Sequence, residues 1–144
     1  MHVVYYGNYL TYFEVGRVEY LRQQGTTIAE IDRKLWMPVV EATVRYVRPA
    51  RLDDLLDVRC WVGERRRASF RFEYEILNDS GERVATGSTL HACQDPATGK
   101  LVAMPPWLSS MMPVVKDGGP SWTPRASWTP RASWTPRASW TPRA

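Results

Sequence analysis

The stretch from Tyr5 to Gly25 constrains the fold most, because it reads as one complete amphipathic helix with a defined start and end. Asn8 is suited to cap the start, since its side-chain oxygen can accept a hydrogen bond from a free N–H of the first turn. Gly25 suits the left-handed position just after a helix end. Gly16 costs about 1 kcal/mol relative to alanine inside a helix, which indicates close packing against another element. We therefore predict a helix that lies across a sheet and is largely covered by it.

Helical spacing separates an apolar stripe of this stretch from a charged side. The charged side holds two acid–base pairs three residues apart, Glu14–Arg17 and Glu19–Arg22, which we expect to meet on the outer surface. The apolar stripe consists of Leu10, Phe13, Gly16, Tyr20 and Leu21.

The chain after Met37 alternates apolar and polar residues in several stretches, which is typical of half-buried strands. Strands joined by short turns are antiparallel. The preceding stretch, 26–37, can hold a short helical turn that ends before Pro38. A curved antiparallel sheet around one long helix is the economical arrangement, so we predict an α+β fold whose outer sheet face is mostly polar. The expected strands are Val39–Arg48, Leu55–Arg65, Ala68–Asn78 and Glu82–Gln94, with a short last strand at Lys100–Met104.

The last 24 residues are four copies of the hexapeptide Ser-Trp-Thr-Pro-Arg-Ala. Units this short cannot stack into a solenoid, and their composition is typical of a disordered tail. We therefore predict a domain at residues 1–110, a linker at 111–120 and a repeat tail at 121–144. The tail carries four arginines and no acid, which equals the formal net charge of +4. The domain itself is therefore neutral, and we expect no nucleic-acid partner.

Two cysteines, Cys60 and Cys93, lie in strand-like stretches without the spacing of a zinc site or a disulfide scaffold. No apolar run reaches the roughly 18 residues that a membrane span needs, and no signal-peptide pattern precedes the domain. We therefore expect reduced, buried thiols in a cytoplasmic protein that has no transmembrane segment, no metal site and no cofactor.

The run Val3–Gly25, VVYYGNYLTYFEVGRVEYLRQQG, resembles the opening helix segment of hotdog-fold acyl-CoA thioesterases of the 4-hydroxybenzoyl-CoA thioesterase type. Within that family it is most similar to the tol-pal-associated thioesterases, and the similarity continues to about Met104. The resemblance implies the hotdog fold, in which a curved antiparallel sheet surrounds one long central helix. It also implies a homodimer or homotetramer with active sites at the subunit boundary. The implied activity is hydrolysis of an acyl-CoA thioester to the free acid and coenzyme A.

Thioester hydrolysis needs a polarised carbonyl group and either an activated water or a carboxylate nucleophile. The free N–H groups and positive dipole end of a helix N-terminus suit the first task. By resemblance, the backbone at Tyr6, Gly7 and Asn8 forms the oxyanion site, with the N–H of Tyr6 as its donor. Glu14 is the carboxylate on the central helix that could serve the second task, although it could instead only pair with Arg17.

The family's catalytic Asp belongs to the motif Asp-x-x-Gly-x-Val, which would place it two positions before Met1. His2 stands where that motif has Gly. We favour a start at an internal methionine of a longer enzyme. The alternative is a truncated chain that binds an acyl thioester or a partner without cleaving it. His2 could also act as a base, whereas His91 lies within a strand and is expected to be structural.

The phosphates of coenzyme A need cations at the rim of the site. The run Arg65, Arg66 and Arg67 is the best candidate, and a solvated hairpin turn is the alternative interpretation. By resemblance, Ala68 and Ser69 lie beside the pantetheine arm and could offer it backbone hydrogen bonds.

Aromatic residues near the helix start are candidates for the acyl pocket. Tyr5, Tyr9 and Phe13 either line that pocket or belong to the core or a subunit interface. A hotdog hydratase is a further alternative, which the thioesterase-type helix motif disfavours. The sequence indicates neither the acyl length nor the choice between dimer and tetramer.

Overall fold

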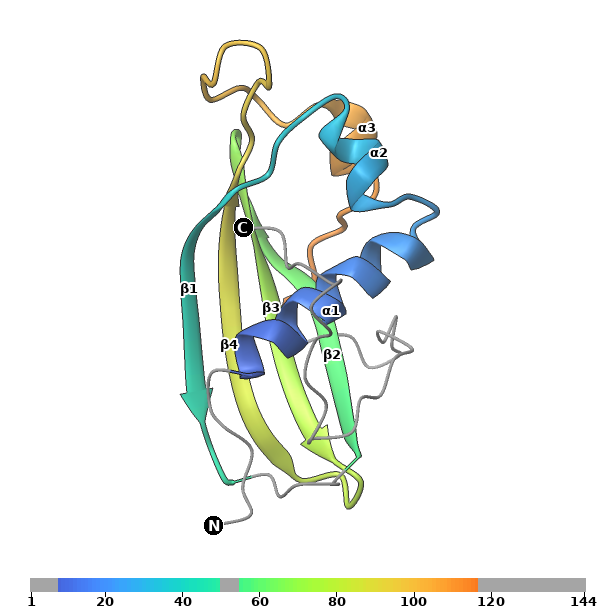
Figure 1. Cartoon of the computed structure of the whole chain (residues 1–144), viewed down its shortest axis with the longest axis vertical. Helices are drawn as coiled ribbons and strands as arrows, with labels where there is room; N and C mark the ends of the chain where they lie inside the picture. The colour runs from blue at the N-terminus through green and yellow to red at the C-terminus, as the bar shows by residue number, and fades with distance from the viewer. Residues whose placement is uncertain (1–7, 50–54, 117–144) are drawn as a thin grey trace.

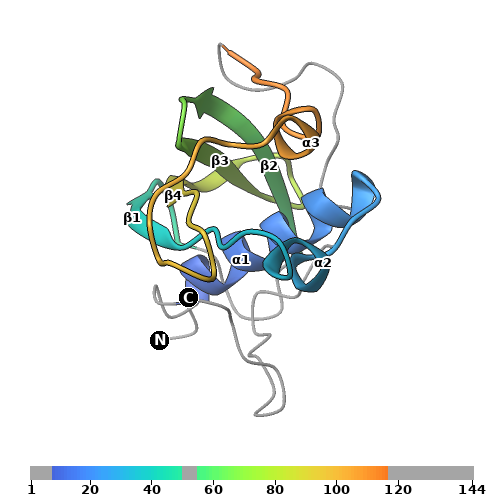
Figure 2. The ribbon, with the colours of Figure 1, turned by 90° about the horizontal axis from the view of Figure 1, so that it is seen from above.

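The computed structural model describes residues 8–49 and 55–116. Its central element is helix α1 (Asn8–Gln23), which lies across one face of a four-stranded antiparallel sheet with the order β1-β4-β3-β2 (Figure 1). Seen from above, the sheet curves around one side of α1 (Figure 2). The predicted helix within a curved sheet is therefore confirmed. The strands are β1 (Val39–Tyr46), β2 (Leu56–Arg65), β3 (Ser69–Asn78) and β4 (Arg83–Ala92), and two short helices are α2 (Ile28–Asp32) and α3 (Pro106–Ser109).

Helix α1 ends as its sequence predicts. Gly25 has a φ of 86°, and the N–H groups of Gly25 and Thr26 donate to the carbonyl oxygens of Arg22 and Leu21 at 3.0 and 3.1 Å. These two bonds form the Schellman arrangement that satisfies the last carbonyls of a helix. The close packing predicted at Gly16 is also present, because a Cβ there would lie 3.1 Å from Cγ1 of Val58.

The two sides of α1 differ from the prediction in detail. Leu10, assigned to the apolar stripe, is 46% exposed, whereas the rest of that stripe is buried. The pair Glu19–Arg22 forms, with Nε of Arg22 donating to Oε2 of Glu19 at 2.8 Å. Glu14 and Arg17, however, are buried and do not lie on the outer surface as expected. The reason is that this side of the helix also faces the sheet, where Nη1 of Arg17 donates to the hydroxyl of Tyr74 at 3.0 Å.

Strand β1 lies at one edge of the sheet, which explains its unexpected exposure. Val44 packs against the core, but Val40, at the β-bulge between Val39 and Glu41, and Tyr46 are 59% and 50% exposed. An edge strand has a neighbour on one side alone, and here that neighbour is β4.

The expected last strand at Lys100–Met104 is wrong. Leu101 forms only an isolated bridge with Gln94, and the N–H of Val102 donates to the carbonyl of Cys93 at 2.9 Å. Strand β4 already pairs with β1 and β3, so it has no free edge for this segment.

The chain after α3 packs on β2. Met112 is fully buried in the core, and the N–H of Val115 donates to the carbonyl of Val62 at 2.8 Å. Packed chain therefore continues beyond residue 110, into the stretch that the sequence analysis assigned to a linker.

Phe13 of α1 meets the sheet where β4 has no side chain. Its ring stacks on Tyr74 with centroids 4.3 Å apart. A Cβ on Gly87 would lie 2.4 Å from the Phe13 ring and 2.4 Å from the carbonyl oxygen of Thr43. The seating of α1 against β3 and β4 therefore requires glycine at position 87.

Gly87→Ala should lower the free energy of unfolding by about 1–3 kcal/mol, because the buried ring and the strand backbone must both move. Gly63→Ala is the matched control: its Cβ would meet Cγ of Glu73 at 2.5 Å, but that side chain is flexible and can rotate away. Its expected cost is below about 0.5 kcal/mol. Urea unfolding of both variants checks this, and equal costs would contradict the account of helix seating.

Candidate active site

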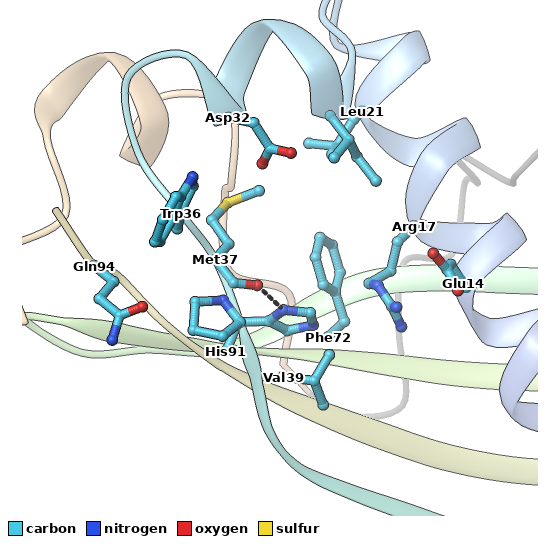
Figure 3. Close-up of a pocket in the computed structure, with 12 residues that line it drawn as sticks. Glu14, Arg17, Leu21, Asp32, Trp36, Met37, Val39, Phe72, His91 and Gln94 are labelled. Atoms are coloured by element: carbon cyan, nitrogen blue, oxygen red, sulfur yellow. Dashed lines mark hydrogen bonds between the residues drawn. The ribbon is translucent and has the colours of Figure 1, made fainter. Parts of the chain in front are cut away.

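A cavity of about 360 Å³ lies between α1 and the connection from α2 to β1. Figure 3 shows side chains from these elements and from β3 and β4 turned toward it. The apolar lining comes from Leu21, Ile28, Trp36, Met37, Pro38, Val39 and Phe72, and the polar lining from Glu14, Arg17, Asp32, His91 and Gln94.

Three elements place the polar groups. Glu14 and Arg17 are neighbours on one face of α1, since residues three apart are adjacent on a helix, and they are 6% and 8% exposed. His91 reaches the cavity from the end of β4. The cavity wall at Trp36 is fixed because its N–H and carbonyl each form a 2.9 Å bond with the backbone of Gln94.

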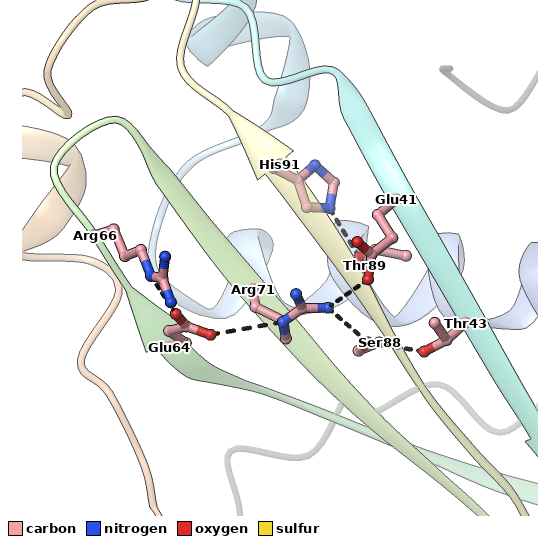
Figure 4. A network of polar contacts seen from close by, with 8 residues as sticks. All are labelled: Glu41, Thr43, Glu64, Arg66, Arg71, Ser88, Thr89 and His91. Carbon is pink, nitrogen blue, oxygen red and sulfur yellow. Dashed lines mark hydrogen bonds and ion pairs between the residues drawn. The ribbon is translucent and has the colours of Figure 1, made fainter.

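Arg17 and His91 are linked by a buried chain of hydrogen bonds. Nη1 of Arg17 donates to the hydroxyl of Tyr74 at 3.0 Å, which lies 2.6 Å from Oγ1 of Thr89. That oxygen lies 2.8 Å from Nε2 of His91, and Nδ1 of His91 lies 3.0 Å from the carbonyl oxygen of Met37. Both ring nitrogens of His91 therefore have partners, as expected for a structural histidine; Figure 3 draws the contact with Met37 and Figure 4 the contact with Thr89.

Burial decides the charge of these groups. Burial and, to a lesser extent, the positive charge of Arg17 lower the pKa of His91 to about 4, although the hydrogen bond to Met37 acts in the opposite direction. Burial also raises the pKa of Tyr74 far above its usual range, although Arg17 acts in the opposite direction. At neutral pH the guanidinium of Arg17 is therefore the one charged group in this series of hydrogen bonds, and its partners are neutral.

The predicted oxyanion residues lie at the start of the described chain. Tyr5, Tyr6 and Gly7 are outside the described residues, and Asn8 is the first residue of α1. Glu14 follows Asn8 by six residues, which is about 9 Å along a helix. Of the α1 residues that line the cavity, Glu14 is the nearest in sequence to the helix start.

The aromatic candidates Tyr9 and Phe13 belong to the core and do not line the cavity. The ring of Tyr9 meets that of Tyr46 edge-on at 5.3 Å. Sequence reasoning missed Arg17 and Trp36 as cavity residues. The signal for Arg17 was its helical spacing from Glu14; Trp36 lies in a connection whose path the sequence did not indicate.

The three consecutive arginines have different roles. Nη1 of Arg65 donates to the carbonyl oxygens of Ser109 and Met112 at 2.8 and 3.0 Å, and so holds the segment after α3. Arg66 pairs with Glu64, as Figure 4 shows. Arg67 is exposed, and no side-chain partner within residues 8–49 and 55–116 is seen for it.

The backbone after this turn is mostly engaged. The carbonyl of Ala68 accepts from the N–H of Cys93 at 2.9 Å, and that of Ser69 accepts from the N–H of Arg66 at 2.8 Å. A ligand here would therefore meet carbonyls that already accept one backbone hydrogen bond each.

Both cysteines are free and buried. Burial raises the pKa of Cys93 to about 11 and that of Cys60 beyond it, so neither supplies the thiolate that cysteine nucleophiles need. In the described part of the chain, no group of three His, Cys, Asp or Glu side chains is placed to hold a metal ion. Nor do the described helices include one with the length and apolar character to cross a bilayer.

Comparison with known proteins gives consistent matches. Residues 1–112 match the thioesterase-like superfamily. The acyl-CoA thioester hydrolase YbgC of Escherichia coli is 33% identical over 104 residues, covering 72% of this chain and 78% of the relative. A 1,4-dihydroxy-2-naphthoyl-CoA hydrolase of Thermosynechococcus vestitus is 29% identical, covering 75% of this chain and 78% of the relative.

Solved structures agree with these matches. A DHNA-CoA thioesterase from Staphylococcus aureus is 34% identical with a TM-score of 0.67, covering 72% of this chain and 70% of that protein. A hypothetical protein from Aquifex aeolicus has a TM-score of 0.72 at 28% identity, covering 78% and 87%. The predicted hotdog fold is confirmed.

The lowered pKa of His91 predicts how stability depends on pH. The unfolded chain binds a proton on His91 from about pH 6.5 downwards, whereas the folded protein does so only near pH 4. Lowering the pH through this window therefore favours unfolding, by up to roughly 3 kcal/mol. Other charged groups near His91 are Arg17 on α1 and, around the same cavity, Glu14 and Asp32.

Urea unfolding at pH 7 and at pH 4.5, with the wild type and His91→Asn, isolates this contribution. Asparagine keeps a donor near the carbonyl of Met37 but does not titrate, while the carboxylates are common to both proteins. The wild type should lose more stability than the variant on acidification. The same loss in both would show that His91 does not titrate as described.

Proposed function

Because the chain belongs to the thioesterase-like superfamily, we propose that it hydrolyses acyl-CoA thioesters to the free acid and coenzyme A. The cavity beside α1 carries this proposal, since it brings a buried carboxylate and a buried guanidinium within reach of a helix N-terminus. The relatives support it: YbgC is an acyl-CoA thioester hydrolase, and the protein from Thermosynechococcus vestitus hydrolyses a naphthoyl-CoA.

In the proposed reaction, the N–H groups at the start of α1 stabilise the negative charge that develops on the thioester oxygen. The carboxylate of Glu14 takes a proton from a water molecule while the oxygen of that water attacks the carbonyl carbon. The C–S bond then breaks and the thiolate of coenzyme A leaves, taking up the proton that Glu14 removed from the water, which returns Glu14 to its carboxylate form. Supporting this role, Glu14 is buried, lines the cavity and lies on the helix whose N-terminus polarises the carbonyl.

The substrate's phosphates would bind at the turn between β2 and β3. Arg66 and Arg67 are the candidates, because both are exposed and Arg65 already holds the backbone after α3. This turn lies at the same end of the sheet as α2 (Figure 1).

We also propose that two copies pair along β1. Its apolar residues Val40 and Tyr46 are exposed in the single chain and would be buried by a second copy. The edge of β1 away from β4 could also pair with β1 of that copy and continue the sheet. Tyr46 contacts Tyr9 in the first turns of α1, so this boundary would lie beside the proposed oxyanion site. The free, buried cysteines fit a cytoplasmic protein.

Glu14→Gln should reduce kcat for thiol release from a panel of acyl-CoAs by about 100-fold or more, the usual effect of removing a general base. Glu19→Gln is the matched control, since Glu19 is also a buried acid of α1 but does not line the cavity. Its activity should remain near that of the wild type. If the wild type hydrolyses no acyl-CoA, the proposed function is wrong. If Glu14→Gln keeps full activity, Glu14 is not the general base.

Val40→Glu should shift the protein from dimer to monomer, because it places a charge in the proposed interface. Leu101→Glu is the control, since Leu101 is 65% exposed but lies outside the strands. Sedimentation over a range of concentrations measures the association. An unchanged dimer in Val40→Glu would place the interface elsewhere.

A further inference from the structure

Arg17 is unusual because its side chain is charged and yet buried, with only 8% of its surface exposed. A guanidinium has five N–H donors in one plane, and the hydroxyl of Tyr74 is the acceptor seen for it in the described part of the chain. The side chain also lines the cavity. The contacts of Arg17 with the protein therefore set the direction in which its guanidinium faces a ligand in the cavity.

The chain from Arg17 to Met37 has one direction only. A guanidinium can only donate and a carbonyl oxygen can only accept. At the Met37 end, Nδ1–H of His91 must donate, so Nε2 of the neutral ring accepts from Thr89. Thr89 therefore accepts from the hydroxyl of Tyr74, which itself accepts from Arg17.

This direction fixes the state of His91. Its Nε2 must be unprotonated and its Nδ1 must carry the hydrogen, so the ring is a neutral Nδ1–H tautomer. A proton added at Nε2 would make that nitrogen a donor, so the Thr89 hydroxyl would have to turn its hydrogen away from His91 and accept there instead. The orientation of Arg17 and the state of His91 are thus coupled through two hydroxyl groups.

The residues at the ends of this hydrogen-bond chain and those in its middle have different surroundings. Arg17, His91 and Met37 line the cavity, whereas Tyr74 and Thr89 do not and are buried in the sheet. Polar groups inside an apolar layer are costly unless all their bonds are made. A chain that crosses the layer and reaches the cavity at both ends is suited to position the groups there.

We propose that Tyr74, Thr89 and His91 are positioning residues, which hold the guanidinium of Arg17 in the orientation that binds an oxygen of the acyl-CoA substrate in the cavity. This inference rests on the proposed function for its substrate. Arg17 contacts the substrate before and during the reaction alike, so loss of its orientation raises KM and leaves kcat nearly unchanged.

The first experiment reads the direction of the chain without using activity. Long-range ¹H–¹⁵N spectra of protein labelled at histidine distinguish protonated from unprotonated ring nitrogens, and His2→Ala assigns the signals of the two histidines. Wild-type His91 should show a protonated Nδ1 at neutral pH. Thr89→Val removes the donor to Nε2 and should raise the fraction of the Nε2–H form, whereas Tyr74→Phe, which keeps that donor, should not.

The second experiment measures what the chain does for the substrate. Tyr74→Phe keeps the ring that stacks on Phe13 but removes the acceptor of Arg17. It should raise KM roughly three- to tenfold, the value of one hydrogen bond, with kcat within about twofold. Thr89→Val should do the same, and Thr89→Ser, which retains the hydroxyl, should restore the wild-type KM. Thr86→Val on the same strand is the control for a change in the sheet.

The outcomes separate the inference from the proposed function. If no acyl-CoA is hydrolysed, the proposed function fails, and binding of a non-hydrolysable acyl-CoA thioether replaces KM as the measurement. An Nε2–H tautomer of His91 in the wild type would show that the inferred direction of the hydrogen bonds is wrong. Unchanged substrate affinity in folded Tyr74→Phe and Thr89→Val overturns its positioning role.

Discussion

The close approach of α1 to the sheet is the contact on which the remaining structure depends. Two glycines make it possible: Gly16 on the helix faces Val58, and Gly87 on β4 leaves room for the ring of Phe13. Because side chains are absent at both points, the helix lies deep against β2, β3 and β4. The cavity lies beside this contact, between α1, the sheet and the α2–β1 connection, so the depth of the helix sets the shape of the site.

The site arises where polar residues interrupt the apolar inner layer of the sheet. Along β3, Phe70, Phe72 and Ile76 follow the apolar pattern, and Tyr74 adds one hydroxyl to it. Thr89 and His91 continue this polar line on β4. Since each group has a partner, the layer keeps its packing while it carries an ordered polar path from the helix to the α2–β1 connection.

The sequence predicted the helix and the four strands because each has a clear period and glycine- or proline-rich ends. It failed at Lys100–Met104, where pairing depended on whether β4 had a free edge. It also failed at Glu14 and Arg17, whose burial depends on tertiary contacts, such as that of Arg17 with Tyr74, that helical spacing does not indicate. The carboxylate of Glu14 was recognisable as a candidate. Its neighbours Trp36 and His91 were not, because they meet only after the chain has crossed the sheet.

The segment after α3 has a consequence for assembly. Val114 forms a parallel bridge with Val62, and Arg65 fixes the turn that leads to it. This edge of the sheet is therefore partly blocked, while within residues 8–49 and 55–116 the outer edge of β1 pairs with no strand. A sheet with one open edge can join a single copy of itself about a two-fold axis and then has no edge left to recruit a third, which closes the assembly and protects it from growing into fibres.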